Sequence, residues 1–238
     1  MISIGKMQEV SKAMIDIVIP TLMLIDSCPL KYSLQEACKS NLINQVIIID
    51  NSGGLFEESI SINSEKIQVL TMPGNIYVNP AWNLGVSKCY SENIVIMNDD
   101  VFCSSEVYMQ IETVMKEENV GICSVQTNIC ADLEDYIDNI SYTQEPIVTN
   151  NIFGNINSNI TGWFFCIKRK LWKNIPDPIK IWYGDNIVYD SVRNKGLLTK
   201  NITTCKIGHI ESPTIKQMNN FSEIISKDLF YYEQTKRR

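Results

Sequence analysis

Short apolar runs alternate along the first half of the chain with segments of helical apolar spacing. The helical segments are the stretch through Leu34, Ala37 and Cys38 and the stretch 80–89. Strands that are apolar on both faces and separated by helices are typical of a parallel sheet covered on both sides. The sequence therefore predicts an α/β fold. The runs that predict its strands are 15–20, 45–50, 67–70 and 93–97.

The second half continues with less regular spacing and gives no sign of an internal repeat. Gly196 is a plausible C-cap for a helix that begins near Trp182. The acidic and Asn-rich stretch 131–160 predicts loops with a short hairpin or helix, so we expect one domain over residues 1–238. The other elements that the pattern predicts are a helix at 106–118, strands at 120–127, 162–167 and within 198–210, and a C-terminal helix at 219–234.

Polar side chains follow each of the first four predicted strands. In open α/β sheets, ligands bind beyond the carboxyl ends of the strands. Asp, Asn and Thr are also ordinary turn and helix-cap residues, so any one of these positions has a structural explanation. Their recurrence at four strand ends favours a ligand site. These residues are Thr21, Asp50 with Asn51, Asn75, and Asn98 to Asp100.

The run N-D-D at 98–100 places two carboxylates side by side at the end of an apolar strand. Burying such a pair costs several kcal/mol, by order of magnitude, unless a cation or a proton compensates. Mg²⁺ and Mn²⁺ prefer oxygen ligands and use one or two protein carboxylates together with substrate phosphates. The run therefore suggests a metal and diphosphate site, with a solvated turn as the alternative.

Composition and charge exclude several classes of protein. Hydrophobic residues make up 45% and charged residues 20%, and no apolar run approaches the length of a membrane span. We expect no stable membrane insertion, no secretory signal and a cytoplasmic location. The net charge of −6 gives no global positive field for a polyanion. The eight cysteines form no C-x-x-C pair, which favours reduced thiols over a zinc site.

Six motifs, taken in order, resemble the GT-A glycosyltransferases, especially those of family 2. The resemblance covers about residues 14–215. It implies a GT-A (Rossmann-like) fold with a central, mostly parallel sheet flanked by helices and a small antiparallel element on the acceptor side. It also implies a nucleotide-sugar-binding half at 14–130, an acceptor and catalytic half at 131–215, and a C-terminal helix at 216–238. The motifs are D-I-V-I-P-T at 16–21, Q-V-I-I-I-D-N-S-G at 45–53, G-N-I-Y-V-N-P-A-W-N-L-G at 74–85, I-V-I-M-N-D-D-V at 94–101, T-G-W-F-F-C-I-K-R-K-L-W at 161–172 and W-Y-G-D-N-I-V-Y-D-S-V-R-N-K-G at 182–196.

The same resemblance assigns roles on the donor side. It places a Mn²⁺ or Mg²⁺ ion on Asp100, the last position of the family's D-x-D motif, and on His209, the single histidine of the chain. Asn98 takes the first position of that motif, where it approaches the ribose, and Asp99 becomes an outer contributor. The positions matched to the nucleotide and its phosphates are Pro20, Thr21, Asp50, Asn51, Asn75, Asn83, Asn98 and Asp99.

On the acceptor side, Asp185 matches the catalytic base, although Gly184 replaces the acid that usually precedes it. The resemblance also puts Gly162, Trp163, Trp182 and Tyr183 at the acceptor. Large aromatic side chains beside an apolar strand are more often core, and we favour that structural interpretation for Trp163 and Trp172. Asp190 and Arg193, three residues apart on one helix, are expected to form an ordinary structural pair.

The leading hypothesis is an inverting, metal-dependent enzyme that moves a sugar from a nucleotide diphosphate sugar to a glycan or lipid-linked glycan. One alternative is a phage or viral enzyme that acts on a modified base in DNA, favoured by the Ile-, Asn- and Lys-rich composition and by basic residues at 168–173, expected near the acceptor. Another is a non-catalytic nucleotide-sugar or glycan-binding module. A dehydrogenase is excluded because no G-x-G-x-x-G follows a strand. A nucleotidyltransferase would be expected to carry a Gly-rich loop with Arg directly after the first strand, and the loop here is T-L-M-L-I-D-S.

Overall fold

The computed structural model describes residues 15–23, 28–140, 143, 145–150, 162–210 and 220–236. The expectation of no secretory signal at the N-terminus, Thr161 of the fifth motif and the Asn-rich stretch 151–160 lie outside these ranges. So do residues 211–215, at the end of the expected catalytic half. Within the described ranges, none of the helices combines the length and the apolar character that a membrane span needs.

The described strands join into one nine-stranded sheet with β7 beside β9, and the other strands follow the order β3-β2-β1-β4-β8-β6-β9-β5. Neighbours in the first four strands are parallel, as predicted, whereas β8 lies antiparallel between β4 and β6. The strands are β1 (Ile15–Thr21), β2 (Ile43–Asp50), β3 (Ile67–Thr71), β4 (Asn93–Met97), β5 (Val101–Phe102), β6 (Val120–Ile129), β7 (Val148–Asn150), β8 (Phe164–Lys168) and β9 (Leu198–His209).

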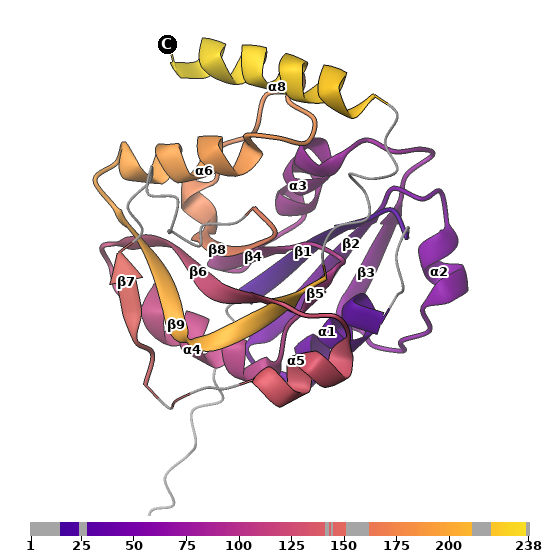
Figure 1. The fold of residues 1–238 in the computed structure, drawn as a ribbon, viewed down its shortest axis with the longest axis vertical. Helices are drawn as coiled ribbons and strands as arrows, with labels where there is room; N and C mark the ends of the chain where they lie inside the picture. Colours follow the sequence, from indigo (N-terminus) through magenta and orange to yellow (C-terminus); the bar gives the residue numbers. More distant parts are fainter. Residues whose placement is uncertain are drawn as a thin grey trace, which may run out of the picture.

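Helices cover both faces of this sheet, which explains why its strands are apolar on both sides (Figure 1). Along β1, Ile17 and Ile19 pack with α1 and α4, while Val18 between them packs with α3 on the other face. This architecture confirms the predicted α/β class. The helices are α1 (Cys28–Lys39), α2 (Leu55–Ser59), α3 (Val78–Ser87), α4 (Ser105–Met115), α5 (Leu133–Asn139), α6 (Gly184–Arg193) and α8 (Phe221–Lys236), with a 3-10 turn η1 (Arg169–Leu171).

The amino end of β1 is fixed by a buried carboxylate. Asp16 accepts hydrogen bonds from the side chains of Asn44 and Gln45, from the backbone N–H groups of Tyr90 and Ser91, and from the Ser91 hydroxyl. Burial alone would raise the pKa of Asp16, but these hydrogen bonds bring it below its ordinary value. The charged carboxylate therefore ties β1, β2 and β4 together at the end of the sheet opposite Thr21.

Helix α8, drawn in yellow, lies beside α6 at the top of Figure 1. Its inward stripe is Ile224, Asp228 and Tyr232, spaced four residues apart on one helical face. An acid on that stripe is unusual, because the same positions of an amphipathic helix normally carry apolar side chains.

Gly196 follows α6 with a φ of 72°, as expected for a helix-ending glycine.

Candidate functional site

The carboxyl ends of β1 and β4 are joined through side chains. The hydroxyl of Thr21 donates a hydrogen bond of 2.6 Å to Oδ2 of Asp99 and accepts one of 3.1 Å from the Met23 backbone N–H. The Leu22 backbone also hydrogen-bonds Asp99. Burial first, and then repulsion from Asp100, raises the pKa of Asp99 to about 6. Asp99 thus connects the ends of β1 and β4. The sequence alone indicated no such structural role for this acid.

Asp100 faces His209 across the antiparallel pair of β5 and β9. Val101 and His209 are direct partners in that pair, and Nε2 of His209 lies 3.3 Å from Oδ2 of Asp100. Both side chains are buried, and the His209 ring stacks on Trp163 at 4.3 Å between ring centroids. Pairing by β9 thus places its last residue, a histidine, beside the acid that follows β4.

Among the described residues, three buried polar atoms around this pair lack a hydrogen-bond partner: Oδ1 of Asn98, Oδ1 of Asp100 and Nδ1 of His209. Native proteins leave few buried polar atoms unsatisfied, and a bound ion or ligand is a common reason for the exceptions. A carboxylate and an imidazole fit Mn²⁺, and fit Mg²⁺ less well, when phosphates and water complete the coordination. Within the described residues, no cluster of three or more His, Cys, Asp or Glu side chains forms a full protein cage.

The segment that precedes β8 connects this pair to Asp185. The Asn98 backbone N–H donates a 2.9 Å hydrogen bond to the carbonyl of Trp163. The next residue back, Gly162, lies so close to Asp185 that a Cβ there would be 3.1 Å from Oδ2 of that carboxylate. This short segment therefore lies beside both parts of the site, with Trp163 stacked on His209 and Gly162 close to Asp185.

Asp185 lies in the first turn of α6, where the helix dipole favours a negative charge. Its Oδ1 accepts a 2.9 Å hydrogen bond from the Asn186 backbone N–H. Burial nevertheless dominates and raises the pKa of Asp185, with this backbone bond opposing the rise. A raised pKa makes the carboxylate a better proton acceptor, which is the property a general base needs.

Gly184 has a packing explanation. A Cβ at this position would lie 2.1 Å from Oδ1 of Asn79 and 2.9 Å from Cδ1 of Ile175. Asn79 cannot easily move aside, because it is buried and its Nδ2 hydrogen-bonds the carbonyls of Ile179 and Trp182. The absence of the usual acid at 184 therefore follows from close approach of α3 to the start of α6.

Several residues matched to the nucleotide already have partners within the protein. Both oxygens of Asp50 accept hydrogen bonds from the turn that leads into α2, from Ser52 and Phe56. The Asn83 side-chain amide donates a 2.8 Å hydrogen bond to the Ile175 carbonyl and accepts one of 3.0 Å from the Ile175 N–H. These side chains have structural duties at the sheet edge, and their contacts to a nucleotide stay predictions.

Asn51 and Asn75 stabilise the turns on the same side. The Asn51 backbone N–H bonds the Thr21 carbonyl at 2.8 Å, and its Oδ1 accepts from the Ile76 N–H at 3.4 Å. Asn75 is exposed, and its Oδ1 accepts a 2.7 Å bond from the Tyr77 N–H. Pro20 is buried within β1. The nucleotide-binding roles of these three residues also stay predictions.

The two aromatic residues expected at the acceptor pack against α8. The Trp182 ring meets Phe221 edge-to-face at 5.6 Å, and Tyr183 stacks on Tyr232 at 4.9 Å. Tyr183 also has a φ of 63°, a strained backbone conformation for a residue with a side chain. Packing against a helix gives both rings a structural role, and acceptor contact stays a prediction for them as for Gly162 and Trp163.

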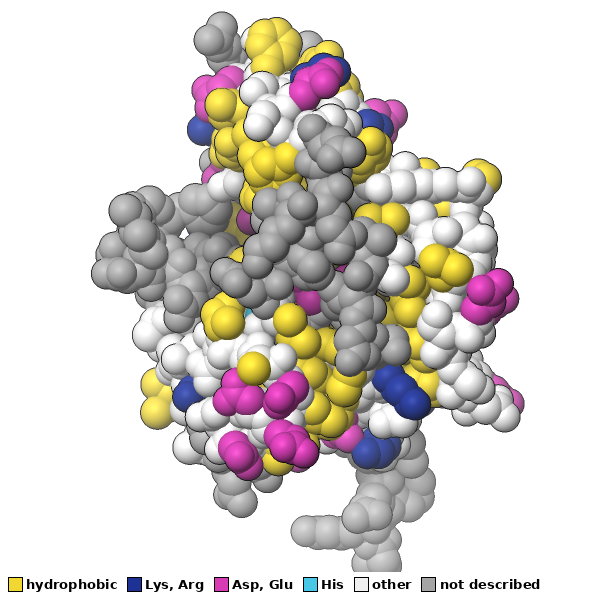
Figure 2. Space-filling model, turned by 45° about the vertical axis from the view of Figure 1, so that its right-hand side comes forward, with side chains coloured by type: hydrophobic (Ala, Val, Ile, Leu, Met, Phe, Trp, Pro, Cys, Tyr) yellow, Lys and Arg dark blue, Asp and Glu magenta, His cyan; other side chains and the backbone are white. Residues whose placement is uncertain are grey.

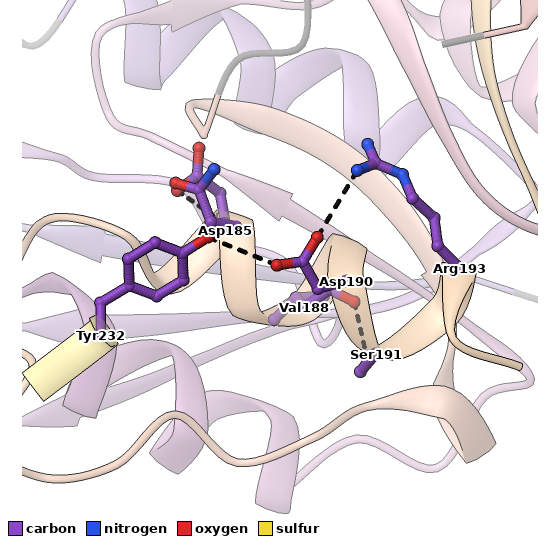
Figure 3. A network of polar contacts seen from close by, with 7 residues as sticks. Asp185, Val188, Asp190, Ser191, Arg193 and Tyr232 are labelled. Atoms are coloured by element: carbon purple, nitrogen blue, oxygen red, sulfur yellow. Dashed lines mark hydrogen bonds and ion pairs between the residues drawn. The ribbon is translucent and has the colours of Figure 1, made fainter. Parts of the chain in front are cut away.

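Asp190 and Arg193 form the expected pair on α6, with 3.5 Å between Oδ1 and Nη1 (Figure 3). Figure 3 also shows the hydroxyl of Tyr232 reaching from α8 to the other oxygen of Asp190, at 3.3 Å. The pair therefore helps to hold α8 on α6.

The location expected for the basic cluster at 168–173 is wrong for its first two residues, Lys168 and Arg169. Lys168 pairs with Asn93, the first residue of β4, so it lies at the opposite end of that strand from Asp100. Its Nζ bonds the carbonyls of Glu117 and Glu118, and Nε of Arg169 bonds the carbonyl of Ser91. The antiparallel direction of β8, which the sequence pattern did not reveal, is the reason. On the face drawn in Figure 2, Lys and Arg side chains of the described residues are scattered rather than grouped.

The sequence interpretation missed Asp228 and Asn79, which hold the segment leading into α6. Asp228 accepts hydrogen bonds from three successive backbone N–H groups, those of residues 180–182. The available signal was the position of this acid on the apolar stripe of a helix. Asn79 gave no comparable signal, because an asparagine in the first turn of a helix is common.

Comparison with known proteins supports the fold. No protein-family model matches the sequence, and no curated protein sequence matches it either. Among solved structures, GalNAc-T7 crystallised with UDP, GalNAc and Mn²⁺ superposes with a TM-score of 0.63 and 13% identity, over 91% of this chain and 48% of that one. Residues 1–349 of S. aureus TarS superpose with a TM-score of 0.54 and 11% identity, over 83% of this chain and 60% of that one.

This chain therefore spans about half of the one structure and three-fifths of the other. At such low identity the likeness concerns the fold alone. It confirms the GT-A fold that the sequence motifs predicted.

Proposed function

We propose that this protein is an inverting, metal-dependent glycosyltransferase that moves a sugar from a nucleotide diphosphate sugar to a hydroxyl of a glycan or lipid-linked glycan. One observation carries the proposal. Gly162 lies beside Asp185, where a Cβ would come within 3.1 Å of the carboxylate, and the next residue, Trp163, stacks on His209 beside Asp100. A candidate base and a candidate metal and diphosphate site thus adjoin one short segment. The UDP and Mn²⁺ named with the GalNAc-T7 structure support the same chemistry.

On the donor side, Asp100 and His209 would hold Mn²⁺ or Mg²⁺. A bound ion of this kind supplies positive charge that neutralises the departing diphosphate. Asn98 would approach the ribose or the phosphates, because its buried Oδ1 has no partner among the described residues. Asp99 acts indirectly, because its carboxylate holds the ends of β1 and β4 together.

On the acceptor side, Asp185 accepts the proton of the attacking hydroxyl. The oxygen forms a bond to the anomeric carbon while the bond from that carbon to the phosphate oxygen breaks, and the nucleoside diphosphate leaves with the electron pair. A single displacement of this kind inverts the anomeric configuration. Burial of Asp185, which raises its pKa, favours proton transfer to its carboxylate.

Each alternative loses one of the observations that favoured it. The DNA-modifying hypothesis relied partly on a basic cluster near the acceptor, and Lys168 and Arg169 instead lie at the far end of β4 with backbone partners. The hypothesis of a non-catalytic module relied partly on Gly184, which the contact with Asn79 explains by packing. A cytoplasmic location is part of the proposal, and the eight free thiols are compatible with a reducing compartment.

A panel of UDP-, GDP-, dTDP- and CMP-sugars, each with and without Mn²⁺, tests the function directly. We expect one class of sugar nucleotide to raise the melting temperature in the presence of Mn²⁺, because a ligand that binds the folded state stabilises it. The selected donor is then incubated with Mn²⁺, and its hydrolysis is followed. Binding without turnover, with wild type and Asp185→Asn alike, would overturn the enzyme in favour of a binding module.

A further inference from the structure

The segment 179–183 joins the acceptor-side strand β8 and its 3-10 turn to the helix that carries Asp185. It has no regular secondary structure of its own, so its backbone groups need partners elsewhere. It ends at Tyr183 in a left-handed conformation, directly before α6 begins at Gly184. The orientation of this segment therefore determines where the first turn of α6, and with it Asp185, is placed.

Asp228 of α8 fixes one side of the segment. Its Oδ1 accepts a 2.9 Å hydrogen bond from the Lys180 N–H, and its Oδ2 accepts bonds of 2.8 Å from the N–H groups of Ile181 and Trp182. The carboxylate is fully buried. Successive backbone N–H groups that converge on one anion form a specific cradle. Bonds to a charged acceptor are about twice as strong as bonds to a neutral one, so this contact is a strong restraint.

Asn79 of α3 fixes the other side. Its Nδ2 donates to the carbonyls of Ile179 and Trp182, each at 3.3 Å, and its backbone N–H donates to the Lys180 carbonyl at 3.0 Å. The N–H groups of residues 180–182 thus point to α8, while the carbonyls of residues 179, 180 and 182 point to α3. With both sets of groups engaged, the segment has little freedom to rotate.

Aromatic packing adds to the same restraint. Trp182 packs on Phe221 and Tyr183 stacks on Tyr232, so α8 contacts the segment along much of its length. Tyr232 also bonds Asp190 one helical turn beyond Asp185, as Figure 3 shows. Among the described residues, the hydrogen bonds of the Asp228 carboxylate go to residues 180–182, whereas Asp100, His209 and Trp163 lie on other elements. The effect of Asp228 on the site therefore runs through the segment and α6.

We propose that Asp228 is a positioning residue for the transfer reaction, which sets the place of Asp185 by binding the N–H groups of residues 180–182. The proposal rests on the function proposed above. A misplacement of about 1 Å costs up to about 100-fold in rate when a reacting group must be oriented. The loss of rate should come from the base alone. The candidate donor site adjoins Trp163, whereas Asp185 lies beside Gly162.

Asp228→Asn keeps the volume of the side chain but replaces one acceptor oxygen with a donor that faces backbone N–H groups. We expect kcat for hydrolysis of the donor selected by the Mn²⁺ panel to fall roughly 10- to 100-fold, while KM for that donor stays within about twofold, because donor-binding elements are untouched. Asp228→Glu keeps the carboxylate and should recover part of the loss. Lys227→Ala is the matched control on the same helix, because Lys227 is exposed and its ion pair is with the exposed Glu223.

A double-variant cycle with Asp185→Asn separates positioning from general damage. If Asp228 acts through Asp185, then adding Asp228→Asn to Asp185→Asn lowers kcat by less than about threefold. Losses that multiply in the double variant, or a kcat in Asp228→Asn equal to that of Lys227→Ala, would overturn the positioning role and leave the proposed function standing. Absence of turnover in the wild type with every donor would overturn both. Circular dichroism melts confirm that each variant is folded at the assay temperature. If Asp228→Asn is not folded there, Asp228→Glu replaces it in the double-variant cycle.

Discussion

Replacing Asp185 by asparagine should separate catalysis from stability. The change is nearly isosteric, and the amide oxygen can still accept the 2.9 Å hydrogen bond from the Asn186 N–H. Only the proton-accepting charge is lost. General base catalysis typically contributes 10²- to 10⁴-fold, which corresponds to roughly 3–5 kcal/mol of transition-state stabilisation. We therefore expect kcat to fall by about that factor, with donor KM little changed.

Stability should move in the opposite direction. Burial raises the folded-state pKa of Asp185 above its value in the unfolded chain, so the folded protein holds this proton more tightly. The ionised carboxylate therefore costs stability above the folded pKa, and the cost disappears as the pH falls below the unfolded value. Asparagine carries no such cost. At neutral pH we expect the variant to melt at or above the wild-type temperature, by about 2–4 °C for each kcal/mol removed, with the difference shrinking in acid.

The assay is steady-state release of nucleotide from the selected sugar donor with Mn²⁺, paired with thermal melts at pH 7 and near pH 4. Asp138→Asn is the control, because Asp138 is exposed on α5. Turnover within threefold of the wild type would refute the assignment of the base. A variant that melts well below the wild type at pH 7 would refute the account of its environment.

Three further outcomes follow from the geometry. Gly162→Ala places a methyl group 3.1 Å from Oδ2 of Asp185, so kcat should fall while the donor-induced rise in melting temperature persists. The acid limb of the pH–rate profile should lie above the ordinary Asp value of 3.8, because the pKa of Asp185 is raised; a limb at or below 3.8 contradicts this. Asp16→Ala leaves the Tyr90 and Ser91 N–H groups without their acceptor, which should cost roughly 2–6 kcal/mol of unfolding free energy in a urea titration at pH 7. Because the pKa of Asp16 is lowered, its contribution is present above the unfolded value and is lost as the pH falls through the folded value, so the gap from wild type should close in acid.

Periodicity and strand-end chemistry predicted much of the donor half, because both signals are local. Four apolar runs became β1 to β4, and the polar residues after them meet at one edge because parallel strands share their direction. The short α2 and β5 were not predicted, since five and two residues are too few for a periodic signal.

Contacts between distant elements could not be predicted in the same way. The antiparallel insertion of β8 beside β4 depends on the path of the whole chain, and it moved Lys168 away from the site. The bond from Thr21 to Asp99 spans 78 residues, and the bonds to Asp228 span 46 to 48. The pairing of His209 with Asp100 was implied by family resemblance, while the structure supplies its cause in the register of β5 and β9.

The central claim is that Asp100 and His209 form the metal and diphosphate site, and Mn²⁺-dependent donor binding tests it most directly. The measurement is the rise in melting temperature caused by the selected sugar nucleotide, with and without Mn²⁺, in the wild type, Asp100→Ala and Asp138→Ala. Asp100→Ala should fold without difficulty, because it removes a carboxylate that repels Asp99. We expect a Mn²⁺-dependent rise in the wild type and Asp138→Ala and none in Asp100→Ala. An undiminished rise in Asp100→Ala would contradict it.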